Sequence, residues 1–261
     1  MFNQRGELPE IIAIWPGFFE LAIYGLAVDL GSTTIAAHLC NLRTGEVIHS
    51  TGVMNPQIRF GEDLMSRVSF SMMNKDGTDK LKTVVREALN ELCIQIVKDC
   101  KIDKKQLVEI TLVCNPVMHH LFLGINPTEL GQAPFALATS DSLYVDSLEL
   151  DLTFLGNTKV YILPCIAGHV GADAAAVILS EEPNKSKENV LIIDVGTNAE
   201  LILGNKKKVL TCSSPTGPAF EGAQISSGQR AAPGAIENVR INPKTKEPVF
   251  KVIGCEGWSN E

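Results

Sequence analysis

One pattern occurs twice in this sequence: an apolar run that ends in aspartate, then a glycine and a hydroxyl residue, then two more apolar runs. The first copy begins with Tyr24 to Asp29, and the second begins with Val190 to Asp194, about 165 residues later. A single Asp-x-Gly-[Ser/Thr] is most often a simple hairpin turn, but two copies that each end a buried strand are far more specific. The repeat therefore predicts two related units, each built on a three-stranded meander.

The residue types at both turns suit phosphate binding. Gly31 and Gly196 allow backbone N–H groups to approach an anion closely, and successive turn amides form an anion-binding nest. The other nucleotide contacts expected in the turns are Ser32, Thr33, Thr34, Thr197 and Asn198. A carboxylate repels phosphate, so Asp29 and Asp194 make sense where Mg²⁺ or its waters lie between the charges. We therefore expect the two units to grip one nucleotide, with Asp29 and Asp194 as the catalytic and metal-binding residues.

The remaining sequence predicts an α/β organisation. Apolar residues at three- and four-residue steps indicate a long amphipathic helix over Asp79 to Cys100. Further elements are expected as strands at 35–41, 46–53, 109–114, 160–163, 199–203 and 208–212, helices at 117–123 and 172–179, a polar loop at 55–67 leading into a helix, and a loop-rich stretch at 126–147. The polar stretch Glu181 to Asn189 is the clearest boundary, so we expect a linker at 1–23, a first lobe at 24–181 and a partial second lobe at 190–261. No strong amphipathic helix is visible between Ser213 and Glu261, so part of the second sheet is expected to lie exposed.

Composition argues against several other classes of protein. The net charge is −7, from 23 basic and 30 acidic residues, so nucleic acid is not an expected partner. The run Ile11 to Leu30 is apolar, but Pro16, Gly17 and Glu20 interrupt it, so it predicts a linker and a buried strand rather than a membrane span or a signal peptide. The seven cysteines contain no Cys-x-x-Cys pair, which indicates buried, reduced thiols rather than a zinc or iron–sulfur site.

Other phosphate-binding and catalytic motifs are missing from the sequence. It contains no Gly-x-x-x-x-Gly-Lys-[Ser/Thr] loop, no Gly-x-Gly-x-x-Gly after a strand and no Gly-x-Ser-x-Gly elbow. His119 and His120 suit metal ligands or an acid–base pair, but a helix face beneath the Asn115 turn accounts for them as well.

The two copies resemble the phosphate motifs of the acetate and sugar kinase, heat-shock 70 and actin superfamily, at Tyr24 to Thr34 and at Ile193 to Glu200. Other stretches narrow this resemblance: Asn-Pro-Gln at 55–57 with Phe-Gly-Glu-Asp-Leu-Met-Ser-Arg at 60–67, and the runs 114–127, 163–173 and 217–236. Together they are similar to the ATPase module of the reductive activators of corrinoid proteins. The resemblance implies an actin-like ATPase fold with ribonuclease H-like lobes, the first essentially complete and the second partial.

The resemblance also implies a function. It implies a cytoplasmic protein that uses ATP and Mg²⁺ to help reduce an inactive Co(II) corrinoid protein to Co(I), through the iron–sulfur cluster of a preceding ferredoxin-like domain. It adds Gly217 and Glu221 to the expected nucleotide-binding residues. The cysteine-rich domain and the adenosine motif of the family are not in this sequence, so we expect a chain truncated at both ends. ATP hydrolysis is therefore expected of the full-length activator rather than of this chain alone.

Two other functions stay open at this point. One is a nucleotide-dependent clamp or sensor that binds a partner with little turnover. The other is a small-molecule kinase of the acetate or sugar type, in which Asp173 or Glu221 would serve as the base. The corrinoid protein is the expected partner, and a homodimer is left open.

Overall fold

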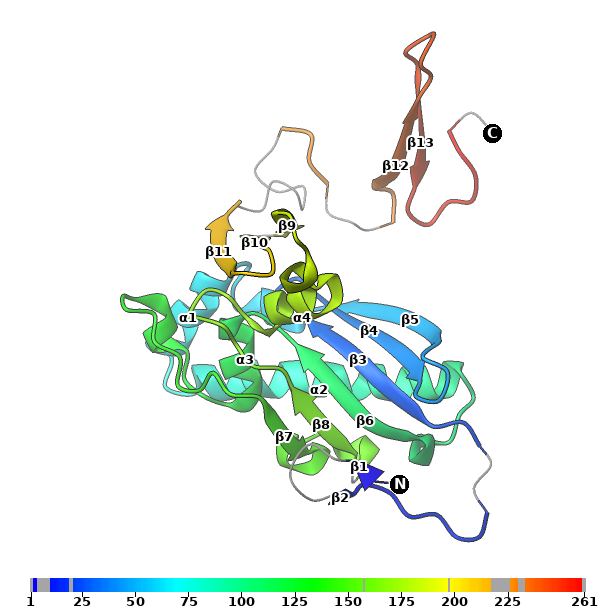
Figure 1. The fold of residues 1–261 in the computed structure, drawn as a ribbon, viewed down its shortest axis with the longest axis vertical. Helices are drawn as coiled ribbons and strands as arrows, with labels where there is room; N and C mark the ends of the chain where they lie inside the picture. The colour runs from blue at the N-terminus through cyan, green and yellow to red at the C-terminus, as the bar shows by residue number, and fades with distance from the viewer. Residues whose placement is uncertain are drawn as a thin grey trace. The chain divides into compact units, whose positions relative to one another are not determined.

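The computed structural model describes residues 2–3, 10–18, 21–156, 158–196, 198–216, 226–229 and 233–259. The chain forms two compact units, Met1–Lys187 and Glu188–Glu261 (Figure 1). Two short strands, β1 (Phe2–Asn3) and β2 (Glu10–Ile11), pair with each other near the N-terminus. Among the described residues, no helix combines the length and the apolarity that crossing a bilayer would require.

The first unit is built on a six-stranded sheet with the order β5-β4-β3-β6-β8-β7. The strands are β3 (Tyr24–Leu30), β4 (Thr34–Asn41), β5 (Val47–Met54), β6 (Leu107–Val113), β7 (Leu143–Asp146) and β8 (Lys159–Ile162). The expected meander is present, because β3, β4 and β5 pair antiparallel in sequence order. β6 runs parallel to β3, and β8 runs parallel to β6, so the carboxyl ends of these three strands meet at one edge of the sheet.

Four α-helices accompany this sheet: α1 (Leu64–Met73), α2 (Gly77–Asp99), α3 (Pro116–Leu123) and α4 (Ala172–Glu181). Figure 1 shows α2 running across one face of the sheet. Two of the helices have an N-cap side chain. The Asp63 carboxylate accepts a hydrogen bond from the Ser66 N–H at the start of α1, and the Asn115 side-chain oxygen accepts one from the Met118 N–H at the start of α3. The glycine Gly124 ends α3 in the left-handed conformation.

The core of the first unit lies between α2 and one face of the sheet. Alternate residues of β3 and β4 and every third or fourth residue of α2 are buried together: Leu26, Val28, Leu30, Ile35, Ala37, Leu39, Leu81, Val85, Leu89, Leu92 and Ile96. Each buried leucine of this kind stabilises the fold by about 1.5–3 kcal/mol through removal of apolar surface from water. The alternation also turns Asp29, the residue between Val28 and Leu30, to the other face of the sheet, where it is exposed.

The second unit contains a three-stranded antiparallel sheet and a separate hairpin. The sheet consists of β9 (Val190–Val195), β10 (Asn198–Gly204) and β11 (Val209–Pro215), with β10 in the middle. One face of it presents exposed apolar side chains: Leu191, Ile193, Val195, Leu203 and Leu210. This exposure agrees with the expectation that part of the second sheet lies in water.

Three elements differ from the expectations. α1 begins at Leu64, inside the stretch expected as a polar loop, because Asp63 caps it. β7 occupies the end of the stretch expected to be loop-rich, where it pairs as an edge strand with β8. The hairpin of β12 (Ile236–Ile241) and β13 (Pro248–Val252) was not expected, because its neighbourhood is rich in proline, glycine and polar residues.

Candidate functional site

The turn after β3 has a geometry that requires glycine at its first position. A Cβ atom on Gly31 would lie 2.5 Å from the Thr34 carbonyl oxygen, which is closer than real Cβ atoms come to other atoms. The backbone of the turn therefore folds tightly onto itself. Asp29 stands two residues earlier in β3, paired across the ladder with Ala36 of β4 and Val113 of β6.

The carbonyl oxygens of Gly31, Ser32 and Thr33 in the turn accept hydrogen bonds from two residues that lie far away in the sequence. The Asn55 side-chain amide donates to the Gly31 carbonyl at 2.8 Å, and the Asn55 backbone N–H donates to the Thr33 carbonyl at 2.8 Å. The Arg67 guanidinium donates to the Ser32 carbonyl at 2.5 Å. Carbonyl oxygens repel anions, so their engagement by the protein removes an obstacle to anion binding at this turn.

Asn55, Gln57 and Arg67 form a buried network behind the turn, and the side chains of all three are 0% exposed. Arg67 also donates to the Gly61 carbonyl at 3.0 Å, to Gln57 Oε1 at 3.2 Å and to the Met118 sulfur at 3.2 Å. The Gln57 amide in turn donates to the Leu81 carbonyl at 2.9 Å. Burial lowers the pKa of the Arg67 guanidinium to about 10, while the charge of Asp63 acts in the opposite direction, so the group stays protonated at neutral pH.

A second carboxylate approaches the same edge of the sheet from α4. The Cys114 carbonyl, just after β6, accepts from the N–H groups of Ala172 at 2.9 Å and Asp173 at 3.4 Å, which fixes the start of α4 over the end of β6. The pKa of the Cys114 thiol lies well above its ordinary value, first because it is buried and then because Cys165, Asp173 and Asp29 lie nearby. Asp29 and Asp173 therefore share the neighbourhood of one buried thiol at the carboxyl ends of β3 and β6.

An apolar hollow of about 650 Å³ lies on the Asp29 side of the sheet. It is lined by residues of the sheet, of the segment after β8 and of α4: Ala27, Val28, Asp29, His38, Thr111, Val113, Tyr161, Leu163, Pro164, Ala175, Ala176 and Leu179. Asp29 thus stands among largely apolar surroundings, where a charge interacts more strongly than it would in open water.

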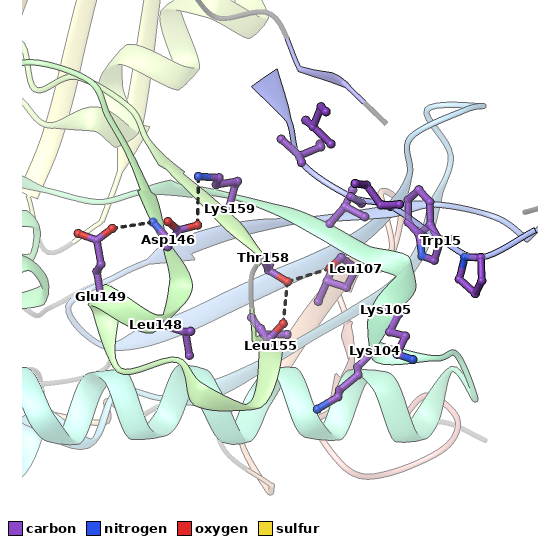
Figure 2. Close-up of a pocket in the computed structure, with 16 residues that line it drawn as sticks. Trp15, Lys104, Lys105, Leu107, Asp146, Leu148, Glu149, Leu155, Thr158 and Lys159 are labelled. Atoms are coloured by element: carbon purple, nitrogen blue, oxygen red, sulfur yellow. Dashed lines mark hydrogen bonds and ion pairs between the residues drawn. The ribbon is translucent and has the colours of Figure 1, made fainter. Parts of the chain in front are cut away.

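A larger hollow of about 860 Å³ lies at the opposite end of β6, beneath the segment that carries Trp15 (Figure 2). Two of its charged lining residues pair with each other, since Lys159 Nζ lies 3.1 Å from an Asp146 carboxylate oxygen. The Thr158 hydroxyl is engaged by the Leu107 carbonyl at 2.9 Å.

The second copy of the motif lies at the end of β9. Asp194 is exposed and stands directly opposite Glu200 of β10. The Gly196 N–H donates to the Asn198 carbonyl at 2.9 Å, and the Thr216 hydroxyl donates to the Gly196 carbonyl at 2.6 Å. A side chain thus holds the glycine carbonyl here, as Asn55 does in the first copy.

Glu200 is a candidate site residue that the sequence reasoning did not single out. Burial raises the pKa of the Glu200 carboxyl, the Ser213 hydroxyl bonded to it at 3.0 Å lowers it, and the neighbouring charge of Asp194 raises it again. The sequence does contain a pattern that could have identified Glu200. It lies six residues after Asp194, and in a tight hairpin this spacing places the two residues opposite each other.

The expected residues are only partly brought together. Gly31, Ser32, Thr33 and Thr34 form one turn with Asp29 at its base, and Gly196 and Asn198 flank the other turn near Asp194. Thr197, Gly217 and Glu221 lie outside the described residues. Asp29 and Asp194 belong to different units, and their pairing across a nucleotide stays a prediction.

The two histidines of α3 are packing residues. His120 Nε2 accepts from the Ala138 N–H at 3.0 Å, so its Nδ1 carries the proton and donates to the Pro116 carbonyl at 3.0 Å. Burial lowers the pKa of both rings, that of His119 to about 4. In the part of the chain that the structure describes, no three histidine, cysteine or carboxylate side chains gather as a metal-binding group.

Two family models match this chain in succession. The RACo middle region matches residues 24–186, and the C-terminal domain of RACo, the ASKHA domain, matches residues 188–259.

Individual relatives agree with these matches. The corrinoid activation enzyme RamQ of Eubacterium limosum is 35% identical over 235 residues, which are 90% of this chain and 39% of RamQ. The Co(II) methylated amine-specific corrinoid protein reductase of Methanosarcina barkeri is 29% identical over 230 residues, 84% of this chain and 41% of the reductase. A solved reductive activator for corrinoid, iron–sulfur protein has a TM-score of 0.87 at 35% identity, over 97% of this chain and 40% of its own.

The chain thus spans about two fifths of the length of these relatives. The similarity in structure confirms the expected α/β, actin-like fold.

Proposed function

Because this chain belongs to the RACo family of reductive activators of corrinoid proteins, we propose that it is the ATP-binding and ATP-hydrolysing module of such an activator. In this role it would use ATP to help return an inactive Co(II) corrinoid protein to the Co(I) state. The corrinoid protein is its partner, and the electron comes from an iron–sulfur centre that the cysteines of this chain do not supply.

The observation that carries this proposal is the turn at Gly31. Its glycine is required by the close approach to the Thr34 carbonyl, and the Gly31, Ser32 and Thr33 carbonyls accept hydrogen bonds from Asn55 and Arg67. A turn built in this way presents amides and hydroxyls to a phosphate group. We assign the phosphate contacts to Gly31, Ser32, Thr33 and Thr34 in the first unit, and to Gly196, Thr197, Asn198, Gly217 and Glu221 in the second.

The donor set at these turns also fits Mg²⁺. Asp29 and Asp194 each lie one residue before the end of a strand and are exposed, so a hydrated ion can reach each carboxylate. Mg²⁺ bound there would neutralise part of the phosphate charge. Asp29 of the first unit and Asp194 of the second would each hold and orient the hydrated ion, and the turn amides would hold the phosphate oxygens.

The test is a calorimetric titration of the 261-residue chain with Mg-ATP. We expect saturable binding that requires Mg²⁺ and that is lost in Asp29→Asn. Asp141→Asn, which removes an exposed carboxylate from a loop, is the matched control and should bind as the wild type does. A wild-type chain that binds no nucleotide, or an Asp29→Asn variant that binds with unchanged affinity, would refute the assignment.

A further inference from the structure

The most unusual buried group of the first unit is Arg67. Its side chain is 0% exposed, and its hydrogen-bond acceptors are backbone carbonyls, the amide oxygen of Gln57 and the sulfur of Met118. Burying a guanidinium among neutral acceptors costs more than burying an apolar side chain of the same volume. Stability alone therefore does not explain an arginine at this position, and the bond to the Ser32 carbonyl indicates what it does.

The geometry of the peptide bond connects this contact to the site. A trans peptide unit is planar, and its C=O and N–H point in opposite directions. When Arg67 holds the Ser32 carbonyl inward at 2.5 Å, the N–H of Thr33 in the same unit must point away from Arg67. The Asn55 amide acts in the same way on the Gly31 carbonyl, and so directs the N–H of Ser32 outward.

We propose that Arg67, together with Asn55, is a positioning residue that sets the direction of the Ser32 and Thr33 amides for phosphate binding. The guanidinium also places a positive charge directly behind the turn, which favours an anion in front of it. The fork of Arg67 is essential to this role, because Nη2 reaches Ser32 while Nε reaches Gly61, and a single ammonium cannot do both. This inference rests on the proposed function only in taking nucleotide phosphate as the ligand.

The chain contains a matched control for Arg67. Arg86 is also buried, at 6% exposure, and its Nε also donates to a backbone carbonyl, that of Phe122 at 2.8 Å. Its Nη1 donates to Asp151 at 2.7 Å. Arg67→Met and Arg86→Met therefore remove the same kind of buried group, but only the first touches the turn.

A second variant separates the two roles of Asn55. Its Oδ1 accepts from the Gln57 N–H at 2.9 Å and caps the following turn, while its Nδ2 donates to the Gly31 carbonyl. Asn55→Asp keeps the capping oxygen and the shape, but replaces the donor with an oxygen that repels the Gly31 carbonyl. A loss of binding in this variant cannot be assigned to the loss of the cap.

The first measurement is made without nucleotide, on chains labelled with ¹⁵N at glycine, serine and threonine. We expect Arg67→Met and Asn55→Asp to shift or broaden the amide signals of Ser32 and Thr33, and Arg67→Lys to do so less. Arg86→Met should leave these signals in place. Wild-type signals for Ser32 and Thr33 in Arg67→Met would overturn the proposal, whatever the chain binds.

The second measurement is the Mg-ATP affinity of the same four variants, with the thermal midpoint recorded for each. Arg67→Met and Asn55→Asp should weaken binding by about tenfold or more, as expected for a lost charge-assisted or oriented contact. Arg86→Met should stay within about twofold at a similar loss of thermal stability. If Arg67→Met and Arg86→Met weaken Mg-ATP binding by the same factor, Arg67 contributes only to the stability of the fold, and the proposal is wrong. If the wild type binds no Mg-ATP while the Ser32 and Thr33 signals respond only to the Arg67 and Asn55 variants, the nucleotide assignment fails and the positioning role stands.

Discussion

Asp194 of β9 and Glu200 of β10 lie directly opposite each other in the antiparallel ladder of the second unit. The two carboxylates stand on one face of a tight hairpin, and their mutual repulsion is one of the causes that raise the pKa of Glu200. A like charge disfavours the ionised form of a neighbouring acid, and carboxyl groups whose pKa is perturbed in this way cluster at functional sites. The titration of the Glu200 carboxyl therefore reports on the charge of Asp194, the proposed metal-binding residue of the second turn.

Asp194→Ala should abolish ATP hydrolysis with little loss of folding, because the side chain is exposed and its removal relieves a like-charge contact. The same variant should lower the pKa of Glu200, which carbon-13 NMR of the glutamate carboxyl groups can follow. Hydrolysis is measured as phosphate release by the longer activator that carries this module. Wild-type turnover in Asp194→Ala would show that the second copy of the motif is only a hairpin.

Gly31→Ala and Gly196→Ala should behave differently, although the two glycines occupy equivalent places in the repeat. A Cβ on Gly31 would lie 2.5 Å from the Thr34 carbonyl oxygen, whereas a Cβ on Gly196 would lie 3.4 Å from the Asn198 carbonyl oxygen, an ordinary contact. We expect Gly31→Ala to destabilise the first unit by about 1–3 kcal/mol and Gly196→Ala to have little effect on stability. Urea denaturation of both variants measures the difference, and equal midpoints would contradict the close approach at Gly31.

The stability of the first unit should fall at acid pH because His119 and His120 are buried in neutral form. Burial lowers the pKa of His119 from its ordinary value near 6.5 to about 4 in the folded chain. The unfolded chain therefore takes up the proton first, and the stability that is present above pH 6.5 is lost as the pH falls toward 4. The loss reaches up to about 3 kcal/mol for His119, and denaturant titrations at a series of pH values measure it.

His119→Leu is the informative variant for this pH dependence. His119 Nε2 is buried and has no hydrogen-bond partner within the described part of the chain, so replacing the ring by an apolar side chain leaves no acceptor or donor unsatisfied. We expect the variant to fold at pH 7 and to lose less stability on acidification than the wild type. An unchanged pH dependence would mean that other groups govern the acid transition.

The thiols should divide into a slowly reacting buried class and a rapidly reacting exposed class. Because no pair of cysteines has the spacing of iron–sulfur ligands, the purified chain should also be colourless and free of stoichiometric iron. Burial raises the pKa of Cys93 to about 12 and that of Cys165 to about 11, while Cys212 and Cys255 are exposed. A chromogenic disulfide reagent should label Cys212 and Cys255 quickly and Cys93 and Cys114 only after unfolding. Rapid labelling of Cys93, or iron bound in proportion to protein, would contradict the packing of these thiols.

Limited proteolysis should cut first between residues 181 and 189 or after Ser213, and leave a resistant first-unit fragment. The three-stranded sheet of the second unit exposes Leu191, Ile193 and Val195. Burial of apolar surface contributes about 25 cal/mol per Å² to the free energy of unfolding, and the second unit lacks this contribution for the exposed side chains. Mass spectrometry of the early fragments locates the cuts. A chain that resists protease throughout and melts in one transition would mean that the second unit is covered.

Local sequence pattern was sufficient for the repeat, the two glycine turns and the buried strands, because each depends on neighbours within a few residues. It was not sufficient for the role of Arg67, which lies at the end of a stretch expected as a polar loop but reaches Ser32, 35 residues away. The same holds for Asn55 and Asp173, whose roles depend on which strand ends the topology brings to one edge. The β12–β13 hairpin was not predicted because the composition around it is typical of a loop. Its turn is stabilised by Asn242, which accepts hydrogen bonds from the N–H groups of Lys244 and Lys246.

The central proposal is that this chain is the ATP-binding module of an activator whose partner is a corrinoid protein. Its most direct test is the affinity of the chain for a purified Co(II) corrinoid protein, measured by calorimetry with Mg-ATP, with Mg-ADP and without nucleotide. The account predicts binding whose affinity changes with the nucleotide, and the loss of that dependence in Asp29→Asn. No binding in any nucleotide state, or one affinity shared by all three states, would contradict it.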